Sequence, residues 1–406
     1  MQFENVIGQK ATKKHLVDLV QQNRLSHALL FLEKEGSGGL AMALAFAQYV
    51  TCISAKKNTP VLPELFGEQI IPVSLQNAEA IDSCGHCSSC IKAQQFIHPD
   101  IHFSFPVIPK KSGTPAVSND YINEWREFIT SNPYGNVYDW LQFLGAANKQ
   151  GNITAEECNQ IIHKLSLKSF ESSYKILIMW MPEFLGKEGN RLLKLIEEPP
   201  PDTLFIFVAG DENAILQTIL SRTQLIKVPL IPVAEIQTEL IKTANITPDR
   251  ASQIAGLSEG NYREALQLLQ NDEQDWQGLI REWLNAILKN NTAAQLKWIE
   301  EISPLGREKQ KQFIRYFIHL LSQALRVRYI NGVELSDVEI HIPENEKDFA
   351  LRLNKLCGIE AQEAIINELD KAIFYIERNA HAKMLFHALS IRLYHIIKDN
   401  SLILVS

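Results

Sequence analysis

The sequence lacks any apolar run long enough to cross a membrane. Its longest runs, Leu40–Phe46 and Ile176–Pro182, fall far short of the roughly 18 apolar residues that a transmembrane helix needs. The first residues, Met-Gln-Phe-Glu-Asn, have neither the basic flank nor the apolar core of a secretory signal. We therefore expect a cytoplasmic protein that makes no membrane contact.

The chain also lacks an excess of basic side chains. Its 406 residues carry 40 Lys and Arg against 47 Asp and Glu, so the formal net charge is −7. A surface that coats DNA neutralises phosphates with clustered Lys and Arg, and this balance therefore favours protein partners. With 46% hydrophobic residues, the chain is not disordered as a whole. Its length predicts about two to four domains.

Cysteine is scarce, and half of the cysteines lie within one short segment. The chain has six cysteines, and three of them form Cys84-Gly-His-Cys87-Ser-Ser-Cys90. A disulfide scaffold is not expected in a cytoplasmic chain of this size, whereas thiols separated by two residues are typical of a structural zinc site. A common iron–sulfur pattern needs a further cysteine at position 94, which is Gln. The spacing therefore predicts zinc, with an iron–sulfur site or an empty site as the alternatives.

Strand and helix patterns alternate along the first 230 residues. A strand at Ala28–Leu32, a turn at Gly36–Gly39 and a helix at Leu40–Val50 form the opening unit of a nucleotide-binding α/β sheet. The later strands are continuous apolar runs, which are typical of a parallel sheet covered on both faces. These strands are expected at Lys175–Met179, Thr203–Ala209 and Leu225–Val228, and helices at Lys10–Gln22, Thr154–Leu165 and Lys187–Glu198.

The patterns divide the chain into three parts. Residues 1–231 are predicted to form the α/β domain, with the cysteine segment at about 51–100 and an insertion at about 101–152. Residues 232–272 predict three short helices, and residues 273–406 predict an all-helical domain with apolar stripes at helical spacing. Within the insertion, two short docked helices are indicated by Trp125, Phe128, Trp140 and Phe143.

The turn after the first strand resembles a phosphate-binding loop that has lost its chemistry. A working loop has the pattern G-x-x-x-x-G-K-[ST], with the lysine on the phosphates and the hydroxyl on Mg²⁺. Here Gly36 and Gly38 remain, but Glu33, Gly39 and Leu40 replace the first glycine, the lysine and the hydroxyl residue. We therefore expect no productive ATP hydrolysis and no bound ATP here. The alternative is that the glycines only make a tight turn.

The strand at Lys175–Met179 has a second defect of the same kind. In an ATPase this strand ends in acidic residues that position Mg²⁺ and the attacking water. Trp180 and Met181 stand at those positions, and Glu183 lies too far along the chain to be assigned as the catalytic acid. Two independent losses in one site predict that the chain does not hydrolyse ATP by itself.

Several motifs together resemble a known family. The chain is similar to the delta-prime subunits of the bacterial DNA polymerase III clamp loader, which are AAA+ proteins without an ATPase of their own. The matching segments occur in the family's order over about residues 3–230, and Glu377-Arg-Asn379 adds a looser match near the C-terminus. They are Phe3–Gln9, Arg24–Leu30, His98–Asp100, Asn190–Pro200 and Ile219–Gln224.

The resemblance assigns a role to one arginine. It implies that Ser221-Arg222 ends a helix at the subunit edge, where Arg222 reaches the ATP of a neighbouring motor subunit. An arginine finger of this kind stabilises charge on the transferring phosphoryl group, and Ser221 positions the loop. The alternative is a surface arginine that caps a helix end beside Gln224. The chain departs from the family at Thr223, where members usually have cysteine.

The resemblance also assigns the remaining site residues. It implies Cys52 as the fourth zinc ligand beside Cys84, Cys87 and Cys90, with His86 or His98 as possible substitutes. Arg263 occupies the position of an AAA+ sensor-2 arginine, which contacts nucleotide. Because no phosphate is expected, a salt bridge or a structural prop is the alternative for Arg263. His98-Pro-Asp100 is interpreted as a turn that closes the zinc module, since Asp side chains bond to nearby backbone.

These implications combine into a fold and a function. The expected fold is an AAA+ parallel-sheet domain with a zinc module, a helical lid domain at 232–272 and a helical collar at 273–406. The expected function is a non-hydrolysing stator that helps to load the sliding clamp onto DNA. Its expected partners are gamma/tau-type ATPase and delta subunits, met through the collar and the AAA+ edge, and the clamp and primer-template DNA. The alternatives are an ATP-hydrolysing AAA+ motor and a zinc-containing nucleic-acid binder.

Overall fold

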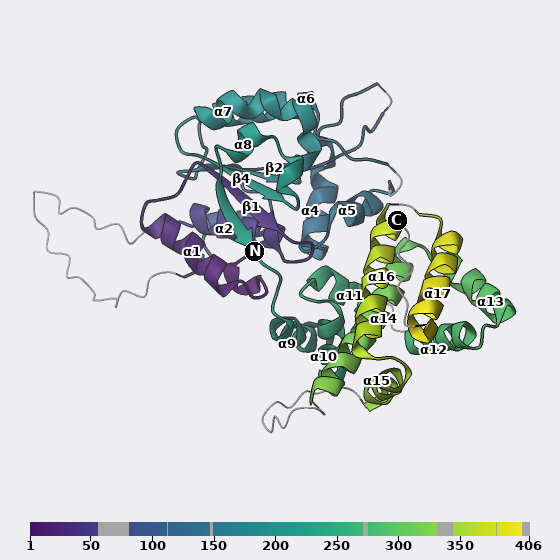
Figure 1. Cartoon of the computed structure of the whole chain (residues 1–406). Helices are drawn as coiled ribbons and strands as arrows, with labels where there is room; N and C mark the ends of the chain where they lie inside the picture. The colour runs from purple at the N-terminus through teal and green to yellow at the C-terminus, as the bar shows by residue number, and fades with distance from the viewer. Residues whose placement is uncertain are drawn as a thin grey trace, which may run out of the picture. The chain divides into compact units, whose positions relative to one another are not determined.

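The chain folds into two compact units (Figure 1). Unit 1 comprises Met1–Thr243 with Ser258–Glu264, and unit 2 comprises Ala244–Leu257 with Ala265–Ser406. The computed structural model describes residues 1–55, 81–111, 113–146, 149–270, 275–330, 344–378 and 380–399. Part of the predicted zinc module (residues 56–80) and Asn379 lie outside this set. Within it, no helix is long and apolar enough to span a bilayer. The three-domain division at residues 231 and 272 stays a prediction.

Unit 1 is built on a five-stranded parallel sheet with the strand order β2-β3-β4-β1-β5. Strands β3 and β4 are buried along their whole length, as their continuous apolar sequences predict. The expected α/β fold class with a C-terminal helical region is therefore confirmed. The strands are β1 (Ala28–Glu33), β2 (Ile101–Ser104), β3 (Lys175–Trp180), β4 (Thr203–Ala209) and β5 (Gln224–Val228).

Helices cover both faces of the sheet (Figure 1). Alternation along β1 sends Leu30 into a core with Ile161 and Leu192 on one face, while Phe31 lies against Phe46 of α2 on the other. Helix α2 is apolar all round and buried along its whole length. The α-helices of this unit before residue 245 are α1 (Lys10–Gln21), α2 (Gly39–Thr51), α3 (Ser88–Gln94), α4 (Ile122–Ser131), α5 (Val137–Phe143), α6 (Ala155–Ser166), α7 (Leu193–Glu197), α8 (Gln217–Leu220) and α9 (Val233–Ala244). Short 3-10 helices lie at η1 (Phe3–Asn5), η2 (Ser118–Tyr121), η3 (Pro182–Leu192) and η4 (Glu212–Ala214).

One predicted helical segment is helical but only partly an α-helix. The segment expected as a helix at Lys187–Glu198 is a 3-10 helix through Leu192, and only α7 is α-helical. Gly186 has φ 51° and ψ −133°, which breaks the segment just before the expected start. Two glycines within four residues lower the helical preference of this stretch, and the tighter 3-10 geometry takes its place.

The insertion is part of the core of unit 1. Its two predicted short helices are α4 and α5, and β2 adds an edge strand beside β3 that the sequence analysis did not separate. Trp125 stacks on Phe105 at a centroid distance of 4.1 Å and lies 5.2 Å from Trp180 of β3. The indole of Trp140 donates a 2.7 Å hydrogen bond to the carbonyl of Pro106. Aromatic packing of this kind anchors the insertion rigidly at the end of β3.

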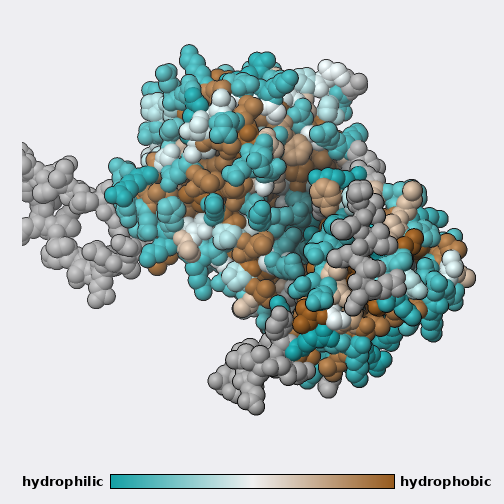
Figure 2. Space-filling view, viewed as in Figure 1, coloured by the Kyte–Doolittle hydropathy of each residue, from teal (hydrophilic) through white to brown (hydrophobic). Residues whose placement is uncertain are grey.

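The described part of unit 2 consists of helices around an aromatic core. Trp283 stacks in parallel on Trp298 at 4.6 Å and donates a 2.9 Å hydrogen bond to Ser390. The predicted stripe from Trp276 to Leu288 is one helix with its apolar face buried. The surface seen in Figure 2 mixes hydrophilic and hydrophobic residues. The helices are α10 (Pro248–Leu257), α11 (Tyr262–Gln270, whose first turn belongs to unit 1), α12 (Trp276–Leu288), α13 (Thr292–Ile302), η5 (Ser303–Leu305), α14 (Arg307–Ile330), α15 (Glu344–Leu356), α16 (Ile359–Glu377) and α17 (Ala382–Asp399).

Candidate functional site

Four cysteine side chains converge in unit 1 and form what we call the cysteine cluster: Cys52, Cys84, Cys87 and Cys90. Their sulfur atoms all lie within 4.8 Å of one another. Cys52 follows the end of α2, whereas the other three lie just before and within α3. Among the described residues, this is the group whose side chains could hold a metal ion. The fourth member of the group is therefore Cys52 rather than a histidine.

The geometry of the cysteine cluster fits a tetrahedral metal. Zinc–sulfur bonds of about 2.3 Å place tetrahedral sulfurs about 3.8 Å apart, and the sulfurs of Cys84 and Cys90 are 3.9 Å apart. Backbone N–H groups donate to the sulfurs of Cys52, Cys84 and Cys87 at 3.4 Å each. Such bonds help to orient the sulfur ligands of a metal site.

The two histidines are held in other contacts. His86 Nδ1 lies 2.7 Å from the carbonyl oxygen of Cys84. His98 Nε2 lies 3.0 Å from the hydroxyl of Ser89, which in turn donates to the carbonyl of Thr51. His98 therefore links the segments that carry Cys52 and Cys90 without joining the cluster. Hydrogen bonds of this kind, made by residues next to the ligands, orient the ligand side chains.

Asp100 makes long-range rather than local contacts. Its carboxylate accepts hydrogen bonds from the backbone N–H groups of Phe170, Glu171 and Ser172 at 2.6 to 2.9 Å. Burial opposes ionisation of this carboxyl, but the three N–H groups outweigh it and hold its pKa below the ordinary value. The predicted turn at His98–Asp100 is present, since the N–H of Ile101 donates to the carbonyl of His98 at 3.1 Å. Only the expectation that the Asp100 side chain bonds to nearby backbone was wrong, because its partners lie at least 70 residues further along the chain.

The glycine turn, residues 33–40, connects β1 to α2. Gly36 and Gly38 have φ +70° and +89°, a backbone conformation that favours glycine. The carboxyl group of Glu33 accepts the backbone N–H of Gly39, at the start of α2. Glu33 is only 8% exposed. The helix N-terminus that binds phosphate in working loops is thus engaged by a carboxyl group of the same chain.

Burial changes the ionisation of Glu33. Desolvation raises its pKa from 4.5 to about 8, and the nearby carboxylates of Glu183 and Glu35 add to the rise, while the bond from Gly39 opposes it. Glu183 itself accepts the N–H groups of Gly210 and Asp211, at 2.5 and 2.9 Å. It therefore ties the end of β3 to the loop after β4. Strand β3 ends in the buried Trp180, where an ATPase needs an acid.

Arg222 lies just after α8 with a third of its side chain exposed. Its Nε donates to Glu197 of α7 at 2.8 Å, and its Nη1 donates to the carbonyl of Thr218 at 2.7 Å. Nη1 also lies 3.0 Å from the hydroxyl of Ser221. Arg222 thus caps the end of α8, as the surface interpretation expected, and the finger role stays a prediction.

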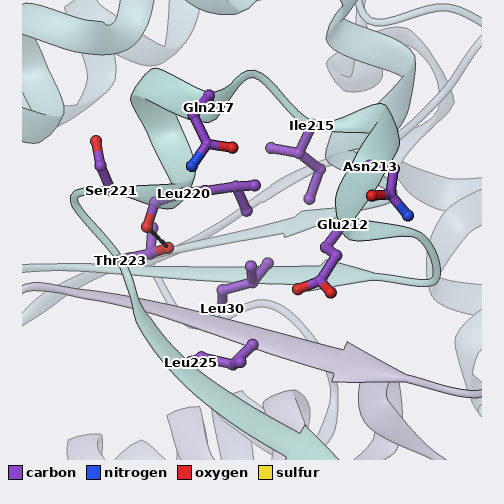
Figure 3. Close-up of a pocket in the computed structure, with 9 residues that line it drawn as sticks. All are labelled: Leu30, Glu212, Asn213, Ile215, Gln217, Leu220, Ser221, Thr223 and Leu225. Carbon is purple, nitrogen blue, oxygen red and sulfur yellow. Dashed lines mark hydrogen bonds between the residues drawn. The ribbon is translucent and has the colours of Figure 1, made fainter.

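An open pocket of about 480 Å³ lies beside this arginine (Figure 3). Figure 3 shows Ser221 and Thr223 on the strand-entry loop, with Leu30 and Leu225 below them. The pocket could not be predicted from the sequence, because its walls come from three separate segments. It is lined by Leu30, Glu212, Asn213, Ile215, Gln217, Leu220, Ser221, Thr223 and Leu225.

Arg263 is buried in a salt bridge, as one of the two interpretations expected. Its side chain is 7% exposed. The guanidinium donates to both carboxylate oxygens of Asp139 and, at 2.8 Å, to Glu35 of the glycine turn. Asp139 belongs to the insertion and carried no signal in the sequence. The partner of Arg263 was therefore missed.

These features define the class of protein: a parallel α/β protein with a nucleotide-type turn that lacks the residues of ATP chemistry, joined to a helical region and a four-cysteine site. The family model described as DNA polymerase III, delta subunit matches residues 8–63 and 66–231, more than half of the chain. The chain belongs to this family. The resemblance drawn from its motifs is thereby confirmed.

Curated relatives of this chain carry the same family name. The DNA polymerase III subunit delta' of Bacillus subtilis is 25% identical over 65% of this chain, and the matched region spans only 60% of that relative. The subunit delta' of Escherichia coli is 24% identical over 80% of this chain and 77% of the relative. A solved gamma subunit-related protein from Thermotoga maritima covers 95% of this chain and 99% of its own, at 14% identity and a TM-score of 0.36.

Proposed function

We propose that this chain is a non-hydrolysing stator of a DNA polymerase III clamp loader. It would form part of a ring of AAA+ subunits that loads the sliding clamp onto primer-template DNA. The observation that carries this proposal is the glycine turn, where Glu33 accepts the N–H of Gly39, and where Gly39 and Leu40 stand at the positions of the phosphate-binding lysine and the metal-binding hydroxyl. A subunit of this type contributes structure to the ring while its neighbours hydrolyse ATP.

In this proposal Arg222 acts in trans on a neighbouring gamma/tau-type ATPase. Its partial exposure and its contact with Ser221 support the role, because the guanidinium is held ready at the surface. To reach a phosphate, Arg222 must exchange the carboxylate of Glu197 for the more highly charged phosphoryl group. An arginine finger raises the kcat of the ATPase site that it contacts by a factor of about 10³–10⁵.

The partners are proposed from the same family relationship. Residues 232–272 would form the lid, and residues 273–406 would form the collar that joins gamma/tau-type and delta subunits. Exposed apolar side chains on α16 and α17 support contacts there, since Phe374, Met384 and Ile391 are all exposed. The cysteine cluster is proposed to hold a structural zinc ion, because its four thiols match the ligand type and spacing that zinc prefers.

The test is the DNA-stimulated ATPase of a reconstituted ring. Arg222→Ala should silence the ATPase site next to this subunit and leave the other sites active. Arg191→Ala is the matched control, because Arg191 is also an exposed arginine paired with a glutamate, Glu188, in the same unit. An unchanged ATPase in the Arg222→Ala ring would contradict the finger. ATP hydrolysis by the isolated chain would contradict the stator and favour the motor alternative.

A further inference from the structure

The glycine turn is packed by side chains from the insertion, a segment whose role neither the motifs nor the family explains. A short stretch of it, residues 132–143, contains α5 and two residues that approach the site. We call this stretch the plug segment. The contacts that carry the argument lie within unit 1.

Tyr134 covers the glycine turn. A β-carbon built on Gly38 would lie 2.5 Å from the Tyr134 ring, so the ring is in direct contact with the turn. The Tyr134 hydroxyl accepts a 2.8 Å hydrogen bond from the backbone N–H of Ile7. The ring also packs edge to face with Tyr262 at 5.0 Å. Tyr134 is buried, and these contacts fix it on three sides.

Asp139 supplies the anion for Arg263. The pair is bidentate, with Nη2 to Oδ1 at 2.7 Å and Nε to Oδ2 at 2.5 Å. A capping box with Asn136 fixes the carboxylate, since Asn136 N–H donates to Asp139 and Asp139 N–H donates to Asn136. A buried guanidinium needs such a partner, because an uncompensated buried charge is strongly unfavourable.

The segment Ser258–Glu264 is held against the same turn. The backbone N–H of Tyr262 donates to the carbonyl of Gly36 at 3.1 Å. The amide oxygen of Asn261 lies so close to Gly36 that a β-carbon there would clash with it. Ser258–Glu264 is the part of the chain that joins unit 1 between two stretches of unit 2. Arg263 and Tyr262, which touch the plug segment, are in this part.

We propose that the plug segment is a built-in substitute for a nucleotide. Tyr134 fills the space over the glycine turn, and Asp139 takes the place of a phosphate on Arg263. Together they hold Ser258–Glu264 against the turn in a chain that binds no ATP. This inference rests on the proposed function, because it names what occupies the site that a stator does not use.

The test uses amide hydrogen exchange of the full-length isolated chain. Asp139→Asn should make exchange in Ser258–Glu264 about tenfold faster or more, because Arg263 loses its bidentate carboxylate partner and keeps only the half-exposed Glu35. Inorganic pyrophosphate should restore much of the protection in this variant and leave the wild type unchanged. Glu127→Gln is the matched control, since Glu127 is an exposed carboxylate of α4 in the same insertion, and it should have no effect.

Two results would overturn the plug. One is unchanged exchange in Ser258–Glu264 after Asp139→Asn, and the other is an equal response of the wild type to pyrophosphate. If Asp139→Asn does not fold, Tyr134→Phe keeps the ring and removes only the hydroxyl. It should then speed exchange in the peptide that contains Ile7, and an unchanged rate there would also count against the plug. Because no ring is needed, failure here is separate from failure of the Arg222 test.

Discussion

Replacing the buried Glu33 by glutamine should remove a pH-dependent loss of stability. The pKa of Glu33 is about 8 in the folded chain against an ordinary 4.5. Between these values the unfolded chain has released the proton while the folded chain still binds it. Unfolding therefore releases a proton, and stability falls as pH rises across this window. The slope is about 1.4 kcal/mol per pH unit, which gives a loss on the order of 5 kcal/mol above pH 8.

Glu33→Gln keeps the acceptor for the Gly39 N–H and cannot ionise. We expect the variant and the wild type to be similar in stability near pH 5, and the variant to be more stable by several kcal/mol at pH 8.5. Pulse proteolysis in urea, with peptides of β1 and α2 quantified by mass spectrometry, measures the stability of unit 1 specifically. The difference between the two proteins cancels groups that titrate in both.

Parallel pH profiles for Glu33→Gln and the wild type would refute this reasoning. They would mean that the carboxyl group is hydrated and ionised in the folded chain, so that its bond to Gly39 does not keep the glycine turn closed. Glu35→Gln is the control, because it removes a nearby carboxylate whose side chain is half exposed to solvent. It should not reproduce the effect.

Gly38→Ala should destabilise unit 1 by about 2 kcal/mol or more, because it adds backbone strain and a clash with Tyr134. In the same proteolysis assay Gly113→Ala should show only the strain, since its φ is also positive but no atom lies within 4 Å of its β-carbon. Asp100→Asn should lower the free energy of unfolding by about 2 kcal/mol at neutral pH. This difference from the wild type should vanish as acid protonates the wild-type carboxyl group. Because the pKa of Asp100 is lowered, the difference should be lost below pH 3.8. Equal stabilities at pH 7 would argue against the Asp100 contacts with Phe170–Ser172. Purified protein should contain about one zinc by elemental analysis, and a strong chelator should speed exchange around the cysteine cluster but not in unit 2; metal-free protein of full stability would contradict the zinc site.

Features carried by adjacent residues were predictable from the sequence. Strand β4 was predicted at its observed bounds, and the loss of lysine and hydroxyl at Gly39 and Leu40 is visible in eight consecutive residues. Cys84, Cys87 and Cys90, just before and within α3, were equally easy to recognise as metal ligands, because a spacing of two residues already brings thiols together. In each case the physical constraint acts within one turn or one strand.

Only the tertiary structure decided which distant residues share a site. Asp139 meets Arg263 across 124 residues of sequence, and Tyr134 meets Ile7 across 127. Cys52 joins its partners because the end of α2 lies beside the start of α3. The edge strand β2 is likewise defined by its pairing with β3. Pairings of this range depend on the order of strands in the sheet and on how the insertion packs, and no local periodicity encodes either.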